Sequence, residues 1–330
     1  MTNASSPLLS VQGLKVHFGA KSAPLRAVED VSFTIGRGET LAIVGESGCG
    51  KTTTGMAICG LQDVTEGQVI FDGKTQQEIA ALSTKERMQY RRRVQVVFQD
   101  PYSSLNPRMS LARTLEEPMR IHGATRAEAR ERADWLLGKV GLNPAHRDRY
   151  PHEFSGGQRQ RVGIARALSL DPDLIICDEA VSALDVSVQA QIINLLMDLQ
   201  DDLGLSYLFI SHDLAVVEHI ADRVAVMYLG RVVEEAPWEQ LFTSPRHPYT
   251  KALLSAIPRP DPSHIDRERV TLSGGMPNPM NPPSGCAFHP RCPQREAQCK
   301  TYRPELETLS EGHKIACHPV TQNQIGSLSA

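Results

Sequence analysis

Four short, continuously apolar runs divide the first two thirds of the chain. They are Thr40–Val44, Val94–Phe98, Leu174–Cys177 and Tyr207–Ile210. Runs of this length are typical of strands that are covered on both faces of a parallel sheet. Between the third and fourth runs, apolar residues recur at helical spacing over 188–199. This alternation of strand and helix predicts an α/β core.

Two regions depart from the core pattern. Residues 8–36 and 68–73 alternate between apolar and polar positions and contain Gly turns, which predicts a small antiparallel β subdomain. Residues 101–165 are predicted to be mostly helical, because Thr125 and Glu128 fit a capping box and apolar residues follow at helical spacing. We therefore expect a helical insertion between two core strands.

Proline marks the end of the regular pattern. Eight of the 22 prolines precede residue 237 and fourteen lie at or after it. We expect a core domain over residues 1–236, with its helical subdomain at about 101–165, and a loop-rich C-terminal extension over residues 237–330.

Composition excludes several classes of protein. With 330 residues, 41% of them apolar and 22% charged, the chain is an ordinary globular sequence. The formal net charge of −3 gives no basic excess, so no nucleic-acid partner is expected. No apolar run approaches the ~18 residues that a membrane-crossing helix needs.

A glycine-rich loop follows the first core strand. Residues 45–52 read Gly-Glu-Ser-Gly-Cys-Gly-Lys-Thr and match the P-loop pattern between a strand and a helix. Glycines let backbone amides converge on phosphate oxygens, Lys51 supplies a cation for the β- and γ-phosphates, and the Thr52 hydroxyl suits Mg²⁺. The expected nucleotide contacts are Gly45, Glu46, Ser47, Gly48, Cys49, Gly50, Lys51, Thr52 and Thr53.

Two carboxylates end the third core run. Asp178 and Glu179 follow Leu174–Cys177, and successive residues of a strand point in opposite directions. The pair can therefore divide the work: Asp178 would hold the Mg²⁺ shell, and Glu179 would act on the attacking water as general base.

A third motif carries a family resemblance. Residues 154–158 read Phe-Ser-Gly-Gly-Gln and resemble the signature of ABC-type ATPases, in which Leu usually stands first. Other landmarks of that family follow in order: Gln99 resembles the Q-loop glutamine, Asp185 the D-loop aspartate and His212 the switch histidine. Phe18 resembles the aromatic residue that stacks on adenine. The resemblance implies a RecA-like P-loop NTPase core with a small antiparallel β subdomain and a helical insertion.

The resemblance also implies a mechanism. Lys51, Glu179 and His212 would be catalytic, and Thr52, Gln99 and Asp178 would serve the Mg²⁺ of bound ATP. A phosphoryl transition state needs donors on more than one side. In ABC proteins the signature of a second subunit covers the far side, and the residues with that role here would be Ser155, Gly156, Gly157 and Gln158.

The tail resembles a narrower group. Residues 244–258 and 281–292 are similar to the C-terminal extension of oligopeptide and dipeptide importer ATPases. That likeness implies a related second ABC ATPase subunit, two transmembrane permease subunits and, indirectly, a periplasmic or extracellular substrate-binding protein. It places the chain peripherally on the cytoplasmic face of the cell (inner) membrane. Transport of another small solute, nickel or glutathione, and a soluble regulatory ATPase without transport are the alternatives.

Four of the seven cysteines lie in this extension. They are Cys286, Cys292, Cys299 and Cys317, spaced C-x5-C-x6-C-x17-C without a C-x-x-C knuckle. The missing knuckle disfavours zinc, and four thiolates can ligate a [4Fe–4S] cluster, which the importer resemblance also implies. Zinc, or thiols without any metal, are the alternatives.

Overall fold

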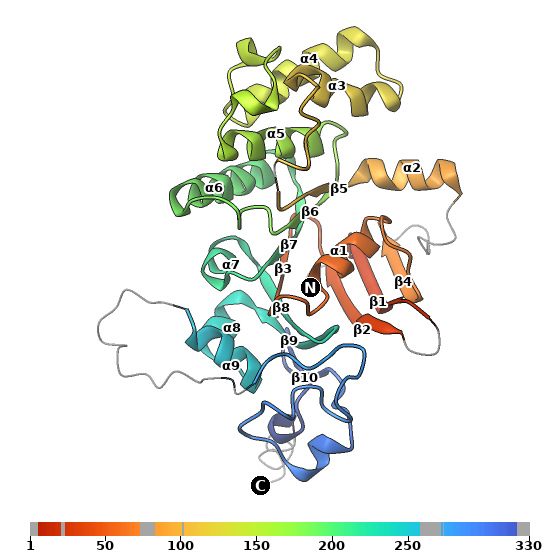
Figure 1. The fold of residues 1–330 in the computed structure, drawn as a ribbon, viewed down its shortest axis with the longest axis vertical. Helices are drawn as coiled ribbons and strands as arrows, with labels where there is room; N and C mark the ends of the chain where they lie inside the picture. Colours follow the sequence, from red (N-terminus) through yellow and green to blue (C-terminus); the bar gives the residue numbers. More distant parts are fainter. Residues whose placement is uncertain are drawn as a thin grey trace. The chain divides into compact units, whose positions relative to one another are not determined.

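The computed structural model describes residues 6–20, 24–72, 83–100, 102–257, 272 and 274–321. The chain forms two compact units (Figure 1). The first unit comprises residues 1–34, 40–80 and 211–330, and the second comprises residues 35–39 and 81–210. Gly73, Pro101 and Pro258, which end or begin segments discussed above, lie outside the described residues.

The first unit contains the predicted antiparallel subdomain. Its strands are β1 (Leu9–Phe18), β2 (Leu25–Ile35) and β4 (Glu66–Phe71), in the order β2-β1-β4. Strands β1 and β4 run antiparallel, with Leu9 opposite Phe71. The buried residues of β1 are Leu9, Val11, Leu14 and Val16, an alternation that shifts by one residue at an irregularity between Gln12 and Lys15 and leaves one face covered. The alternating pattern of the sequence therefore predicted this element correctly.

A second sheet segment of the first unit carries the phosphate-binding loop. Its strands lie in the order β10-β11-β9-β8-β3. Strands β3 and β8 pair in parallel, and the β8–β9, β9–β11 and β10–β11 pairs are antiparallel. The bounds are β3 Thr40–Val44, β8 Arg223–Tyr228, β9 Arg231–Pro237, β10 Glu307–Ser310, β11 His313–Ile315, α1 Lys51–Ile58, α7 Leu214–Ile220, α8 Trp238–Thr243 and α9 Pro248–Ser255.

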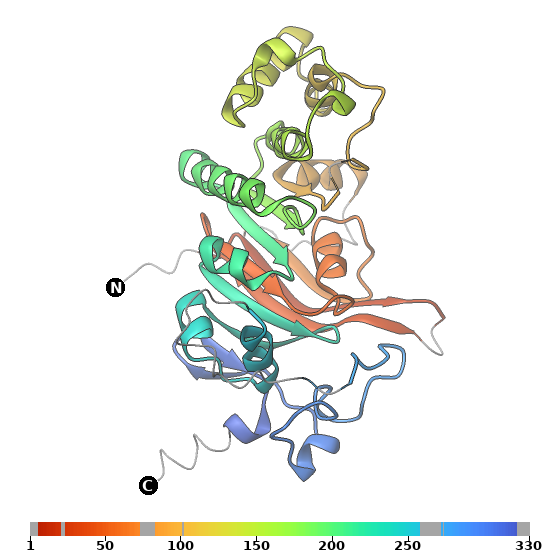
Figure 2. The same ribbon diagram turned by 60° about the vertical axis from the view of Figure 1, so that its left-hand side comes forward.

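The C-terminal extension is more regular than its proline content predicted. It contributes α8 and α9, a 3-10 turn at Ala297–Lys300, and the strand pair β10–β11. Figures 1 and 2 show the blue C-terminal segment reaching the edge of β9, where Ile315 of β11 pairs with Glu234. Proline density signalled the many turns but not this long-range strand pairing.

A buried polar group fixes the extension to β9. Glu234 is fully buried and accepts hydrogen bonds from the backbone amides of Arg246 (2.7 Å) and His247 (2.9 Å), and it contacts Nε2 of His313 at 2.8 Å. His247 caps α9, because its Nδ1 accepts a hydrogen bond from the Tyr249 amide at 3.1 Å. Burial lowers the pKa of His247 from 6.5 to about 4. The neutral imidazole is therefore the form that the fold requires.

We expect acid to destabilise this anchor. A histidine whose folded pKa lies below its unfolded value contributes stability above pH 6.5 and loses it as the pH falls toward 4. When the pH falls from 7 to 5, the titration of His247 should lower the free energy of unfolding by about 2 kcal/mol. Denaturant unfolding of the full chain at both pH values measures it. His247→Asn keeps a capping acceptor without titrating, so its pH dependence should be flatter; equal slopes would contradict the assignment.

The second unit contains three parallel strands and the helical insertion. The strands lie in the order β7-β6-β5, and every residue of β6 and β7 is buried, as the continuous apolar runs predicted. The bounds are β5 Val94–Val97, β6 Leu174–Asp178, β7 Ser206–Ser211, α2 Thr84–Arg93, α3 Leu111–Ile121, α4 Arg126–Lys139, α5 Gly156–Leu168 and α6 Val186–Leu203.

The helical insertion follows the predicted pattern. The Thr125–Glu128 capping box is present: the Thr125 amide donates to Glu128 Oε2 at 2.8 Å, and the Glu128 amide donates to Thr125 Oγ1 at 3.3 Å. Figure 2 shows α3, α4 and α5 as neighbours, with 3-10 turns at Pro144–His146 and Pro151–Glu153. Within the described ranges, no helix combines the length and apolar character that crossing a bilayer requires.

Candidate ATP-binding and hydrolysis site

The P-loop joins β3 to α1 in the first unit. Helix α1 begins at Lys51, and Gly50 occupies the N-cap position with φ of +105°. Lys51 Nζ donates to the carbonyl oxygens of Gly45 (2.8 Å) and Glu46 (3.1 Å), and the lysine is 4% exposed. The loop therefore holds the ammonium group of Lys51 in place. The backbone amides of the first turn of α1 have no carbonyl acceptor within the helix, so they are suited to bind phosphate oxygens.

Two glycines of the loop are required by close backbone contacts. A Cβ at Gly45 would lie 2.2 Å from the carbonyl oxygen of Met227, and a Cβ at Gly50 would lie 2.2 Å from that of Ala27. Both glycines also adopt positive φ, which disfavours any side chain. The path of the loop is thus set by its packing against β2 and β8.

The remaining loop positions divide into exposed and buried ones. Ser47, Gly48 and Thr52 are exposed, and Thr53 is half-buried. Cys49 is buried, and burial raises the pKa of its thiol, so its side chain packs and only its backbone is suited to contact phosphate. A lysine, a hydroxyl and loop amides form a donor set that fits a triphosphate and its cation.

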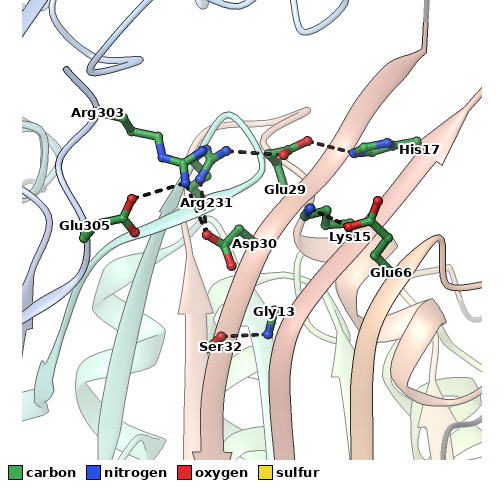
Figure 3. A network of polar contacts seen from close by, with 10 residues as sticks. All are labelled: Gly13, Lys15, His17, Glu29, Asp30, Ser32, Glu66, Arg231, Arg303 and Glu305. Atoms are coloured by element: carbon green, nitrogen blue, oxygen red, sulfur yellow. Dashed lines mark hydrogen bonds and ion pairs between the residues drawn. The ribbon is translucent and has the colours of Figure 1, made fainter. Parts of the chain in front are cut away.

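Phe18 lies at the end of β1 and is 36% exposed. Its strand is tied to the rest of the unit by a chain of charges, shown in Figure 3. Glu29 contacts His17 Nε2 at 2.7 Å and Arg231 at 3.4 Å. Arg231 and Arg303 both contact Asp30, at 3.8 Å and 3.4 Å. The antiparallel subdomain is therefore linked to β9 and to the extension by ion pairs.

The predicted acid pair lies at the end of β6 in the second unit. Asp178 is the last strand residue and is 6% exposed. Glu179 is not part of the strand: its φ is +48°, and its amide donates to the carbonyl of Ile210 at 2.9 Å. The sequence argument from strand alternation is therefore wrong for Glu179. The backbone of Glu179 instead adopts a left-handed conformation, which is unfavourable for a residue other than glycine and sets the direction of the Glu179 side chain. Backbone strain of this kind clusters at functional sites.

Gln99 and Glu179 meet although 80 positions separate them. Gln99 Nε2 donates to Glu179 Oε2 at 2.9 Å and to Ser182 Oγ at 3.2 Å. The Ser182 hydroxyl donates to the Glu179 carbonyl at 3.0 Å. Gln99 itself is exposed, two residues after β5. The predicted Q-loop glutamine, Gln99, is thus hydrogen-bonded to the predicted general base, Glu179.

The signature residues form the start of α5. Ser155 is the N-cap, its amide donates to Gln158 Oε1 at 3.0 Å, and the Gln158 amide donates to Ser155 Oγ at 3.4 Å. A Cβ at Gly157 would lie 2.5 Å from Cγ1 of Val188 on α6. Ser155 and Gln158 are exposed, and Gly156 and Gly157 are partly exposed, so the start of this helix is accessible to solvent.

Asp185 and His212 are also exposed. Asp185 occupies the N-cap position of α6. His212 directly follows β7, and its neighbour Asp213 caps α7 by accepting a hydrogen bond from the Ala215 amide at 2.9 Å. Both residues are therefore held at element ends with their side chains accessible.

The four tail cysteines do not support the predicted iron–sulfur cluster. All seven cysteines are free, and Cys299 and Cys317 are buried. Burial, and then the neighbouring thiols, raise the pKa of Cys286 to about 11 and that of Cys317 to about 12. The described residues contain no group of three or more Cys, His, Asp or Glu side chains arranged to hold a metal ion.

Comparison with known proteins decides the family. An ABC transporter profile matches residues 28–182, and an oligopeptide/dipeptide transporter C-terminal profile matches residues 233–299. The dipeptide transport ATP-binding protein of Haemophilus influenzae is 51% identical over 329 residues, covering 96% of this chain and 99% of the relative. The chain belongs to the ABC transporter ATP-binding family. A peptide import ATP-binding protein from Brucella ovis is 55% identical over an alignment that covers 94% of this chain and 98% of the relative.

Solved ABC proteins share the fold. CbiO1 of Clostridium perfringens, part of an ABC transporter complex, superposes with a TM-score of 0.65 at 30% identity. The superposition covers 73% of this chain and 92% of CbiO1. An ATP-binding cassette solved as a dimer after hydrolysis, with ADP and Pi, superposes with a TM-score of 0.61 at 29% identity. The superposition covers 70% of this chain and 98% of the cassette. The ABC protein described here therefore has the RecA-like P-loop fold and is an ATPase.

Proposed function

We propose that this ABC ATPase powers the import of di- or oligopeptides through a membrane transporter. The observation that carries the proposal is the joining, in one chain, of a P-loop ATPase core to a C-terminal region of the oligopeptide/dipeptide transporter type at residues 233–299. Relatives named for dipeptide transport and for peptide import align over nearly the whole chain. The core domain would span residues 1–236 and the extension residues 237–330.

We assign the roles in hydrolysis as follows. Lys51 and the amides of the P-loop bind the β- and γ-phosphates, and Phe18 stacks on the adenine. When Mg²⁺ is bound with ATP, it neutralises phosphate charge, and Thr52, Gln99 and Asp178 would hold it. Glu179 accepts the proton of the attacking water, and Gln99 positions the Glu179 carboxylate through the bond of 2.9 Å. His212 acts as the switch residue at the γ-phosphate.

A second ATPase subunit would complete each site. The exposed start of α5, with Ser155, Gly156, Gly157 and Gln158, offers amides and a hydroxyl to the phosphate that the partner holds. Asp185, exposed at the start of α6, would lie at the same interface. We infer a related hetero-partner, two transmembrane permease subunits and a periplasmic or extracellular binding protein, with this chain peripheral on the cytoplasmic face of the inner membrane.

Reconstitution tests this proposal. The chain should copurify from membranes with a second ATPase and two multispanning subunits. In proteoliposomes, ATP hydrolysis should rise severalfold when the cognate binding protein carries a dipeptide. Stimulation only by nickel or by glutathione would reassign the substrate, and an ATPase that copurifies with soluble partners alone would establish the alternative of a regulatory protein without transport.

A further inference from the structure

The P-loop is bonded to a residue of the extension that lies 245 positions away. Arg291 Nη1 and Nη2 donate to the two carboxylate oxygens of Glu46, at 2.7 Å and 3.0 Å. The side chain of Arg291 is 7% exposed and that of Glu46 is 29% exposed. A bidentate, largely buried pair of this kind is strong and directional, unlike the average ion pair at a protein surface.

The extension also holds the backbone of the same loop residue. The Glu46 amide donates to the hydroxyl oxygen of Tyr249 at 2.9 Å. Tyr249 is fully buried and packs edge-on against Tyr228, with ring centroids 4.8 Å apart, and its ring is tilted against that of Phe288, with centroids 5.4 Å apart. Arg291 is fixed in turn, because its amide donates to the Phe288 carbonyl at 3.0 Å. One aromatic cluster therefore positions both groups that contact Glu46.

Glu46 is an unfavourable residue for its location unless it is neutralised. It lies in the loop that receives a highly negative triphosphate, and its carbonyl oxygen accepts a hydrogen bond from Lys51 at 3.1 Å. A free carboxylate here would repel the phosphates and would compete for the charge of Lys51. The guanidinium of Arg291 offsets both effects by pairing with the carboxylate.

We propose that the C-terminal extension completes the ATP site: Arg291 neutralises and orients Glu46, Tyr249 fixes the Glu46 backbone, and together they set the affinity of the P-loop for nucleotide. Arg291 and Tyr249 are positioning residues that act through Glu46. The extension is then part of the ATPase machinery itself. This inference rests on the ATPase activity and not on the identity of the transported solute.

A set of variants separates charge neutralisation from mere packing. Mg-ATP binding by the full chain is measured by calorimetry for Arg291→Met, for Arg291→Met combined with Glu46→Gln, and for Arg295→Met. Arg291→Met should weaken binding about tenfold, because it leaves the carboxylate uncompensated. The double variant should return to within about threefold of the wild type, because the repelling charge is gone. Arg295 is exposed on the same loop, so its variant should bind normally.

Two outcomes would overturn the proposal. A folded Arg291→Met protein with wild-type affinity would show that Glu46 needs no partner. A double variant as weak as Arg291→Met would show that the arginine acts by packing alone. Salt provides a further readout, since the deficit of Arg291→Met should shrink as ionic strength rises.

Tyr249→Phe keeps the test decisive if Arg291→Met does not fold. This change preserves the ring of the cluster and removes only the hydroxyl that accepts the Glu46 amide hydrogen bond. We expect nucleotide binding to weaken severalfold, with ATP turnover at saturation largely retained, because a displaced loop affects binding before chemistry. Unchanged affinity in Tyr249→Phe would refute the role of the extension. The proposed function is tested separately: a wild-type complex whose ATP hydrolysis is not stimulated by peptide would count against it and would leave these nucleotide affinities unchanged.

Discussion

Glu179→Gln should reduce ATP hydrolysis by at least about a hundredfold while Mg-ATP remains bound, because the change removes a general base and little else. The glutamine has nearly the same shape, and its amide oxygen can still accept the hydrogen bond from Gln99. Bound ATP that is not hydrolysed should accumulate, and with it the nucleotide-bound dimer. Single-turnover hydrolysis and gel filtration with ATP measure the two effects.

The control for that experiment is Glu131→Gln. Glu131 is exposed on α4 in the same unit. The Glu131→Gln protein should hydrolyse ATP at the wild-type rate. If Glu179→Gln turns over at the wild-type rate, the base is another group and the role of the left-handed turn at residue 179 has to be reassigned.

Lys51→Ala should abolish measurable nucleotide binding at micromolar ATP. Lys51 is the cation of the P-loop, and its ammonium also bonds the carbonyls of Gly45 and Glu46. Removing it takes away both the charge that meets the β- and γ-phosphates and the brace that shapes the loop, a loss on the order of a hundredfold in affinity. Calorimetric titration with Mg-ATP is the direct measurement.

Lys300→Ala is the matched control, because Lys300 is an exposed lysine of the same unit. Its affinity for ATP should equal that of the wild type, and circular dichroism should show that both variants are folded. Retention of ATP by a folded Lys51→Ala protein would exclude residues 45–52 as the nucleotide site.

Local patterns predicted the parts of this molecule that local physics determines. Continuous apolar runs identified Thr40–Val44 and Leu174–Cys177 as buried strands, and the capping box identified the start of α4. The P-loop was recognised because its glycines, its lysine and its flanking strand all lie within a dozen residues. In each case the deciding signal is contained in a few consecutive residues.

Features that depend on distant contacts could not be predicted in this way. The left-handed turn at Glu179 is stabilised by the carbonyl of Ile210, and nothing in residues 174–179 announces it. The bond between Glu46 and Arg291 joins two residues that lie 245 positions apart, and the local sequence at neither position indicates the contact. The cysteine spacing suggested a cluster, but spacing does not place the four side chains in space, and the described residues contain no group arranged to hold a metal ion.

The pairing of β11 with β9 has a consequence for how the protein behaves in a crowded cell. Without the extension, β9 would be the outermost strand of its sheet segment, with a row of amides and carbonyls open to other chains. The chain instead ends that sheet with β10, a strand of four mostly exposed residues from Glu307 to Ser310. A short, polar final strand disfavours edge-to-edge aggregation, so β10 and β11 also protect this sheet edge from pairing with other chains.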